Sequence, residues 1–169
     1  MRSNASKVDL PQSDDEQMLV EYENIDATYP RDWREKVFRY CDFNGIDIDG
    51  LNFEGILQSC TLTGCRFYWG LFNCALLADV RFVDCTFPGT SFRSTKFVEC
   101  RFECCNFTLD NLGGDCTMDD CTLAACRFES CVWTTKPGAK RDITNTRFFA
   151  CTMSACTGLD GLLGTQSRK

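Results

Sequence analysis

The sequence contains no histidine, only four prolines and no apolar run long enough to cross a membrane. The lack of histidine excludes Ser-His-Asp and Cys-His catalytic arrangements, and every zinc site that uses imidazole. The N-terminus has no apolar stretch of the kind found in signal peptides, and a transmembrane helix would need about 18 consecutive apolar residues. We therefore expect a cytoplasmic protein with reduced thiols and no membrane partner.

Positive charge is also in short supply. The 169 residues carry 24 acidic and 18 basic side chains, a formal charge of −6. Such a charge argues against direct binding to the phosphate backbone of a nucleic acid. Residues 1–36 account for −4 of this charge and residues 37–169 for −2, so the acidity is concentrated in an N-terminal arm.

Large apolar residues recur at every fifth position, a period that fits neither a helix nor an alternating strand. Twelve consecutive centres of this repeat are Leu57, Leu62, Phe67, Phe72, Leu77, Phe82, Phe87, Phe92, Phe97, Phe102, Phe107 and Leu112. With one-residue displacements the repeat also includes Phe43, Ile48 and Phe53 upstream, and Met118, Leu123, Phe128, Trp133, Ile143, Phe148 and Met153 downstream. The pattern indicates a chain that turns one corner in each repeat, with the large residue inside.

Cysteine follows the same period and precedes a centre by two residues at 11 of its 14 positions. We interpret these thiols as small fillers of the interior, because zinc sites use cysteine pairs two to four residues apart. Stacked thiols in a reducing compartment also disfavour disulfides. We expect no metal and no cofactor, and the candidates for redox chemistry are the outward-facing Cys74 and Cys104.

Units such as Cys65-Arg66-Phe67-Tyr68-Trp69 and Cys105-Asn106-Phe107-Thr108-Leu109 resemble the pentapeptide-repeat proteins. The resemblance covers about residues 41–155. It implies an all-β fold, a right-handed quadrilateral parallel β-helix with four repeats in each square coil. The shifts near residues 53–57 and 112–118 and an insertion at 134–142 are expected to form bulges or external loops.

The flanks of the repeat are predicted to cap it. We divide the chain into an acidic N-terminal arm and cap (1–37), the β-helix (38–157) with an external loop at 134–142, and a C-terminal cap and tail (158–169). The C-terminal segment either closes the last coil or meets a second copy of the chain in a homodimer. A short N-terminal helix is predicted from a capping-box pattern and from apolar residues at helical spacing, at Ser13, Glu16, Met18, Leu19, Tyr22 and Ile25.

If twenty residues make one coil, each residue stacks on the one twenty positions later, ~4.8 Å away. Allowing one extra residue after Leu112, one face then carries the centres Phe67, Phe87, Phe107, Phe128 and Phe148, over the thiols Cys65, Cys85, Cys105 and Cys126. Exposed aromatic residues beside arginine are typical of interface hot spots. The partner-binding candidates on this face are Tyr68, Trp69, Leu109, Phe149, Arg66, Arg127 and Arg147. The alternative is that these are scattered apolar residues of the kind that the surfaces of soluble proteins tolerate.

A second candidate surface is acidic. Asp79, Glu99 and Asp120 are expected in one column, with Asp84, Glu103 and Asp119 close by. Like charges about 5 Å apart repel by roughly 1 kcal/mol even in water. Such a column is costly unless a basic partner meets it or nearby Arg81, Lys96 and Arg101 neutralise it.

The sequence has no paired carboxylates, phosphate-binding glycine loop or nucleophile elbow, so we do not expect an enzyme. The first hypothesis is a protein-binding protective or immunity factor that neutralises a toxin or shields the toxin's target. The family resemblance implies a second, a DNA-mimicking protein that binds DNA gyrase or topoisomerase IV, both type II topoisomerases, and confers quinolone or toxin resistance. The charge of only −2 along the repeats argues against it. A third hypothesis is a structural scaffold module.

Overall fold

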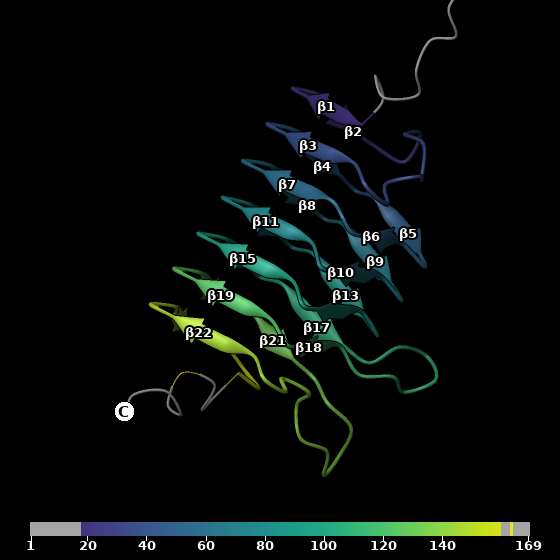
Figure 1. The fold of residues 1–169 in the computed structure, drawn as a ribbon. Helices are drawn as coiled ribbons and strands as arrows, with labels where there is room; N and C mark the ends of the chain where they lie inside the picture. Colours follow the sequence, from purple (N-terminus) through teal and green to yellow (C-terminus); the bar gives the residue numbers. More distant parts are fainter. Residues whose placement is uncertain (1–17, 160–162, 164–169) are drawn as a thin grey trace, which may run out of the picture.

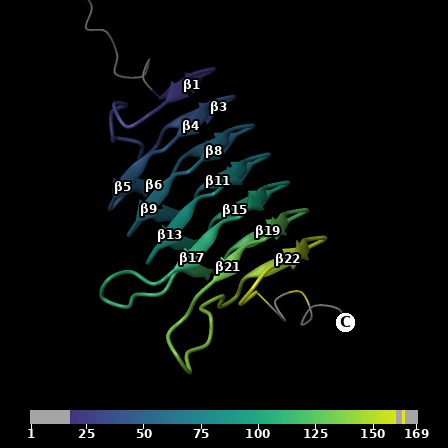
Figure 2. The same cartoon turned by 180° about the vertical axis from the view of Figure 1, so that it is seen from behind.

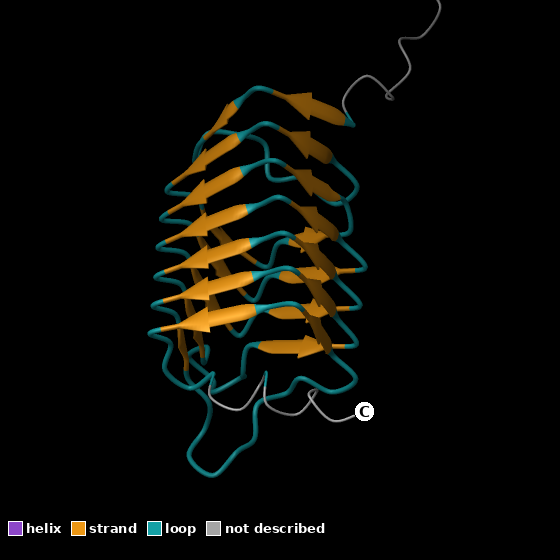
Figure 3. Cartoon of the chain, turned by 90° about the vertical axis from the view of Figure 1, so that its left-hand side faces the viewer, coloured by secondary structure: helices purple, strands orange, loops and turns teal. Residues whose placement is uncertain are grey.

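The computed structural model describes residues 18–159 and residue 163. Over these residues the chain winds into a tower whose walls are four parallel β-sheets (Figure 1). Viewed from the side, strands of successive coils lie above one another along each wall (Figure 3). This arrangement is a quadrilateral parallel β-helix, which confirms the fold predicted for the repeats.

We name the sheets A to D in the order in which the chain visits them. Sheet A contains β1 (Leu19–Glu21), β3 (Val37–Arg39), β7 (Ile56–Gln58), β11 (Leu76–Ala78), β15 (Lys96–Val98), β19 (Thr122–Ala124) and β22 (Arg147–Phe149). Sheet B contains β2 (Asn24–Ile25), β4 (Asp42–Asn44), β8 (Thr61–Thr63), β12 (Arg81–Val83), β16 (Arg101–Glu103), β20 (Arg127–Glu129) and β23 (Thr152–Ser154). Sheet C contains β5 (Asp47–Asp49), β9 (Arg66–Tyr68), β13 (Thr86–Pro88), β17 (Asn106–Thr108) and β21 (Val132–Trp133). Sheet D contains β6 (Asn52–Phe53), β10 (Leu71–Asn73), β14 (Ser91–Arg93) and β18 (Thr117–Asp119).

The geometry of one corner explains the period of five. Most strands have three residues, of which only the middle one points inward, as Phe102 does in β16. The next residue turns the corner in the left-handed region, as at Cys104 with φ 53° and Gly64 with φ 61°. The fifth residue points inward again and is small, as at Cys105. We call the four lines of corners the A–B, B–C, C–D and D–A edges.

The predicted N-terminal helix is wrong over the residues that the structure describes. Leu19–Glu21 forms β1, which extends sheet A beside β3. Tyr22 turns a corner with φ 58°, and Ile25 is buried in β2. The apolar spacing in this segment is therefore that of another β-coil. Ser13 and Glu16, the residues of the expected capping box, lie outside the described residues.

Both ends of the tower are covered by apolar side chains. The segment between β2 and β3 crosses the N-terminal end, where the buried Trp33 packs on Phe38 and Phe43 with ring centroids 5.3 and 5.2 Å apart. At the other end Leu159 is buried. Most of the predicted C-terminal cap and dimer contact, residues 158–169, lies outside the described residues.

The first predicted shift in the repeat is a corner that lacks one residue. Val37 pairs with Ile56 and Ile56 pairs with Leu76, so the first of these coils is one residue shorter than the second. Gly55 occupies the inward corner position here, and a Cβ atom on it would lie 2.0 Å from the carbonyl oxygen of Lys36. Glycine is therefore required for the shortened corner to approach the coil before it.

The second predicted shift is larger than expected. Phe72 pairs with Phe92, and Phe92 pairs with Met118, so the later coil is six residues longer. The extra residues form a loop between β17 and β18 that projects from the tower (Figure 2). Leu112, predicted as a centre, is 79% exposed in this loop. The prediction of one extra residue after Leu112 is therefore wrong.

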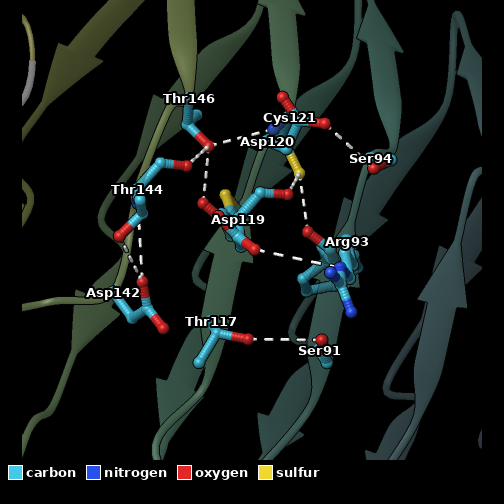
Figure 4. Close-up of polar contacts among 12 residues, drawn as sticks. Ser91, Arg93, Ser94, Thr117, Asp119, Asp120, Cys121, Asp142, Thr144 and Thr146 are labelled. Atoms are coloured by element: carbon cyan, nitrogen blue, oxygen red, sulfur yellow. Dashed lines mark hydrogen bonds and ion pairs between the residues drawn. The ribbon is translucent and has the colours of Figure 1, made fainter.

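The predicted external loop at 134–142 follows β21, and the chain then returns to sheet D. The backbone N–H groups of Met118 and Asp120 donate to the carbonyls of Asp142 and Thr144 at 2.9 and 2.7 Å. The Thr146 hydroxyl also donates to the Met118 carbonyl at 2.5 Å (Figure 4). These contacts continue the wall of sheet D by one more coil.

Candidate functional site

The interior is built from rings stacked along the tower axis. Phe82, Phe102 and Phe128 lie in register in sheet B, with centroids 4.8 and 4.7 Å apart and planes 4° from parallel. Thiols beside the rings bond to the backbone, and Cys100 Sγ donates to the Leu77 carbonyl at 3.2 Å. The predicted column that joins Phe128 to Phe107 is wrong, because the six additional residues move Phe128 to another wall.

Most thiols are committed to this interior. Ten are buried, and only Cys74 and Cys104 are exposed. Burial raises the pKa of Cys60 to about 11 and that of Cys121 to about 12. A thiol with such a pKa stays protonated at neutral pH, which makes it a weak nucleophile and metal ligand. The candidates Cys74 and Cys104 turn corners on the D–A and B–C edges, so they do not face each other.

Tyr68 and Trp69, two of the candidate binding residues, hold the loop that follows β17. The Tyr68 hydroxyl bonds to the side chain of Asn111 and accepts the Asn111 backbone N–H at 3.1 Å. The Trp69 indole N–H donates to the carboxylate of Asp110. The Arg66 guanidinium lies over the Tyr68 ring, 4.8 Å from its centre. Three residues predicted to meet a partner thus contact their own chain.

Asp110 organises this loop, whose length the sequence analysis underestimated. Besides the Trp69 indole, its carboxylate accepts the backbone N–H groups of Leu112 and Gly114, each at 2.7 Å. These hydrogen bonds, led by that from Trp69, lower the pKa of Asp110. Leu109, another candidate, begins the loop. The run of Asp, Asn and two Gly residues at 110–114 was an available turn signal.

The other candidates lie on different walls from Tyr68. Arg127 is in β20 of sheet B, whereas Arg147 and Phe149 are in β22 of sheet A. The single face predicted for all seven candidates is therefore wrong. Arg127 and Phe149 nevertheless border the same A–B edge, because the Ala125 N–H donates to the Phe149 carbonyl at 2.8 Å and Arg127 follows two residues later.

The predicted acidic column is also divided. Asp79 and Glu99 stand in one column on the A–B edge, where the Asp79 carboxylate accepts the Ser59 hydroxyl at 3.1 Å. Asp120 follows β18 and lies on the D–A edge, and Asp84 follows β12 on the B–C edge. The longer coil again accounts for the displacement of Asp120.

Two of the acidic candidates are paired with arginine. Glu103 accepts hydrogen bonds of 2.9 and 2.7 Å from Arg81, one coil away, and these bonds lower the pKa of Glu103. Asp119 lies 3.9 Å from Arg93 on sheet D (Figure 4). The acidic side chains are thus distributed over several edges and partly neutralised within the chain.

Comparison with known proteins identifies the repeat. A model of the family described as pentapeptide repeats matches residues 72–109 in eight copies. These residues lie within the coils whose corner geometry gives the period of five. The chain contains pentapeptide repeats. A search of curated proteins found no match to it.

Several solved structures are similar to this pentapeptide-repeat protein at low identity. A trypsin-treated form of QnrB1, a plasmid-mediated fluoroquinolone resistance protein, is 16% identical, with coverage of 82% of this chain and 73% of that one and a TM-score of 0.31. Rfr23 from the cyanobacterium Cyanothece is 9% identical over 72% and 90% of the two chains, with a TM-score of 0.41. HetL from the cyanobacterium Nostoc, involved in heterocyst differentiation regulation, is 10% identical over 82% and 69%, with a TM-score of 0.31.

The outer surface of this pentapeptide-repeat protein is hollowed in several places. One hollow of about 220 Å³ lies on the A–B edge beside Asp79, Arg81 and Arg101. Another of about 510 Å³ lies at the N-terminal end, beside Leu19 and Tyr29. Within the described residues no cluster of three His, Cys, Asp or Glu side chains could hold a metal ion. The described part of the chain also has no helix that could cross a lipid bilayer.

Proposed function

We propose that this pentapeptide-repeat protein is a non-enzymatic, protein-binding protective factor of the cytoplasm, which neutralises a toxin or shields the toxin's target. The observation that carries this proposal is the difference between the side chains of the interior and those of the outer surface. The interior positions hold packed rings and buried thiols such as Cys60, whose pKa is raised by burial. The exposed groups are side chains on a regular outer surface, such as Phe149, which are suited to contact rather than to catalysis.

The second candidate function is mimicry of DNA toward a type II topoisomerase, DNA gyrase or topoisomerase IV. The straight stacking of coils in Figure 3 favours it, because a rod of stacked coils can occupy a groove that binds a duplex. The placement of acidic groups disfavours it. Glu103 and Asp119 face arginines, and Asp120 stands on another edge from Asp79. A scaffold without a dedicated ligand ranks third.

Capture from the native cell tests the protective function. The tagged full chain is crosslinked in the cell, and copurifying proteins are identified by mass spectrometry and then reconstituted with the purified chain. We expect one stoichiometric partner that is a toxin or the target of one, and whose toxicity or inhibition the chain relieves. A chain that captures no reconstitutable partner, or one whose activity it leaves unchanged, would contradict the proposal.

A supercoiling assay distinguishes DNA mimicry from the protective function. Purified chain is titrated into DNA gyrase and topoisomerase IV reactions, with and without a quinolone that traps cleaved DNA. Unchanged supercoiling and cleavage over a wide concentration range eliminate DNA mimicry and leave the protective function standing. Relief of trapped cleavage favours mimicry instead.

A further inference from the structure

The A–B edge of the last coils carries two columns of exposed side chains. On sheet A, Val98 is in register with Ala124 and Ala124 with Phe149. On sheet B, Arg101 is in register with Arg127. Only two residues separate the end of each sheet A strand from the start of the next sheet B strand. We call these five residues the lower A–B edge; an apolar column lies on one side of its corner and a cationic column on the other.

The lower A–B edge is open to solvent. Val98 is 39% exposed and Phe149 is 49% exposed. Glu99, Ala125 and Ala150 turn the three corners between the columns, so small side chains stand at two of them, where a bulky group would shield the edge. Exposed aromatic and aliphatic groups beside arginine have the composition of interface hot spots.

The two arginines of this edge differ from others on the tower. Arg81 is paired with Glu103 at 2.7 Å and Arg66 with Asp47 at 2.7 Å. Within residues 18–159 neither Arg101 nor Arg127 has an ion pair. Their strands are neighbours, so the two cationic side chains start about 4.8 Å apart and repel. An anionic group supplied from outside would relieve this repulsion.

Acidic groups near the edge limit the footprint of a partner. Glu103, at the other end of the strand that begins with Arg101, is engaged by Arg81. Glu129 stands at the far end of the strand that begins with Arg127. Glu99 turns the upper corner of the edge. A partner's carboxylates are therefore favoured along the arginine column and disfavoured above and beyond it.

We propose that the lower A–B edge binds an acidic amphipathic helix of a protein partner. The proposal rests on the protein-binding function argued above and specifies the chemistry of the partner. A helix lying along the edge advances about 4.5 Å in three residues, close to the spacing of about 4.8 Å between strands. Carboxylates at positions i and i+3 would thus meet Arg101 and Arg127, while an adjoining leucine stripe covers Val98 and Phe149.

A designed peptide provides the probe. It is an alanine-based, fluorescein-labelled helix with glutamates at i and i+3 and a neighbouring leucine stripe, and its control has the same composition in scrambled order. Fluorescence anisotropy with the full chain is expected to show binding at least ten-fold tighter for the ordered peptide, weakening as salt increases. Equal binding of the two peptides would overturn the proposal.

Variants locate the contact. Arg101→Gln with Arg127→Gln should weaken binding of the ordered peptide ten-fold or more, and Phe149→Ser should weaken it several-fold. The matched control, Arg93→Gln with Lys140→Gln, removes two charges away from this edge and should leave binding within two-fold. Thermal melting verifies that each variant is folded. Unchanged binding by the first double variant would place the contact elsewhere.

Two further results distinguish this proposal from its alternatives. If sedimentation shows a dimer that Phe149→Ser converts to a monomer, a second copy occupies the edge and the helix proposal is overturned. If the partner captured from the cell binds the Arg101→Gln, Arg127→Gln variant as tightly as the unaltered chain, this proposal fails while the protective function survives. Loss of both peptide and native partner binding in that variant supports it.

Discussion

The C–D and A–B edges are opposite corners of the same square coils, yet their exposed aromatic residues have different uses. On the C–D edge, Trp69 is hydrogen-bonded to Asp110 and holds a loop of its own chain. On the A–B edge, Phe149 is 49% exposed and stands near Arg127, which has no ion pair in the described part of the chain. The comparison teaches that an exposed aromatic residue on this scaffold is available to a partner only where its own chain does not already bind it.

The largest expected effect concerns the interior that both edges share. Phe102→Ala removes a ring stacked between Phe82 and Phe128, and we expect a loss of about 3–5 kcal/mol in the free energy of unfolding. Phe149→Ala, on the exposed A–B edge, should cost well under that. Urea unfolding at neutral pH measures both. Equal losses would show that Phe149 belongs to the core and would remove the distinction between edge and interior.

Alkaline pH should lower the stability of the fold through the buried thiols of the interior and not through the side chains of the edges. Burial raises the pKa of Cys60 to about 11, above the usual thiol value of about 8.5. The native state thus favours the neutral thiol, so this stability is complete below pH 8.5 and is lost as pH rises toward 11. At about 1.4 kcal/mol for each pKa unit, Cys60 alone accounts for roughly 3 kcal/mol.

Urea unfolding between pH 7 and pH 11 tests this dependence. Cys60→Ala should flatten the alkaline decline in stability, whereas Cys104→Ala, at an exposed corner, should leave it unchanged. An equal response from both variants would mean that the buried thiols do not control the alkaline transition.

The interior could be predicted from the sequence because one physical rule acts at every coil. Each corner needs a large inward residue and a small one two positions earlier, so Phe102 and Cys100 were assigned correctly from spacing alone. The same rule failed at Leu112, which is exposed in a loop but by coincidence follows the centre Phe107 by five residues. Periodicity does not distinguish a core leucine from one in a turn-rich insertion.

The outer surface could be predicted less well, because stacking depends on counting every residue between coils. The loop before β18 moved Phe128 to sheet B and separated Asp120 from Asp79, and the longer coil through residues 134–142 moved Phe148 to sheet A. At the N-terminus, Tyr22 and Ile25 matched helical spacing, although Ile25 lies in a strand. The loop contacts of Trp69 join residues far apart in the chain, so no local pattern could reveal them.

A smaller, local effect is expected at the C–D edge, where Asp110 joins Trp69 to the loop, a contact for which the A–B edge has no counterpart in the described residues. Asp110→Ala removes the acceptor of the Trp69 indole and of two backbone N–H groups. We expect hydrogen exchange of the amides in residues 109–115 to accelerate by about ten-fold or more, with little change in the coils. Leu112→Ala, in the same loop but exposed, is the matched control. Faster exchange throughout the tower would show instead that the loop supports the fold.

The smallest expected effect concerns Arg81, which is already paired with Glu103. Glu103→Gln removes the negative charge and one of the two oxygens that accept from Arg81, but both side chains are partly exposed, so we expect the thermal midpoint to fall by no more than about 2 °C. Because these bonds lower the pKa of Glu103, the stabilisation is present above the usual carboxyl range and is lost as pH falls through it. Melting curves at pH 7 and pH 3 should therefore differ for the unaltered chain by slightly more than for the variant.

Arg101→Gln should leave the midpoint unchanged or raise it, since it relieves repulsion in the arginine column. A marked loss of stability in Arg101→Gln would mean that this side chain, like that of Trp69, is used by its own chain, and the contrast between the two edges would disappear.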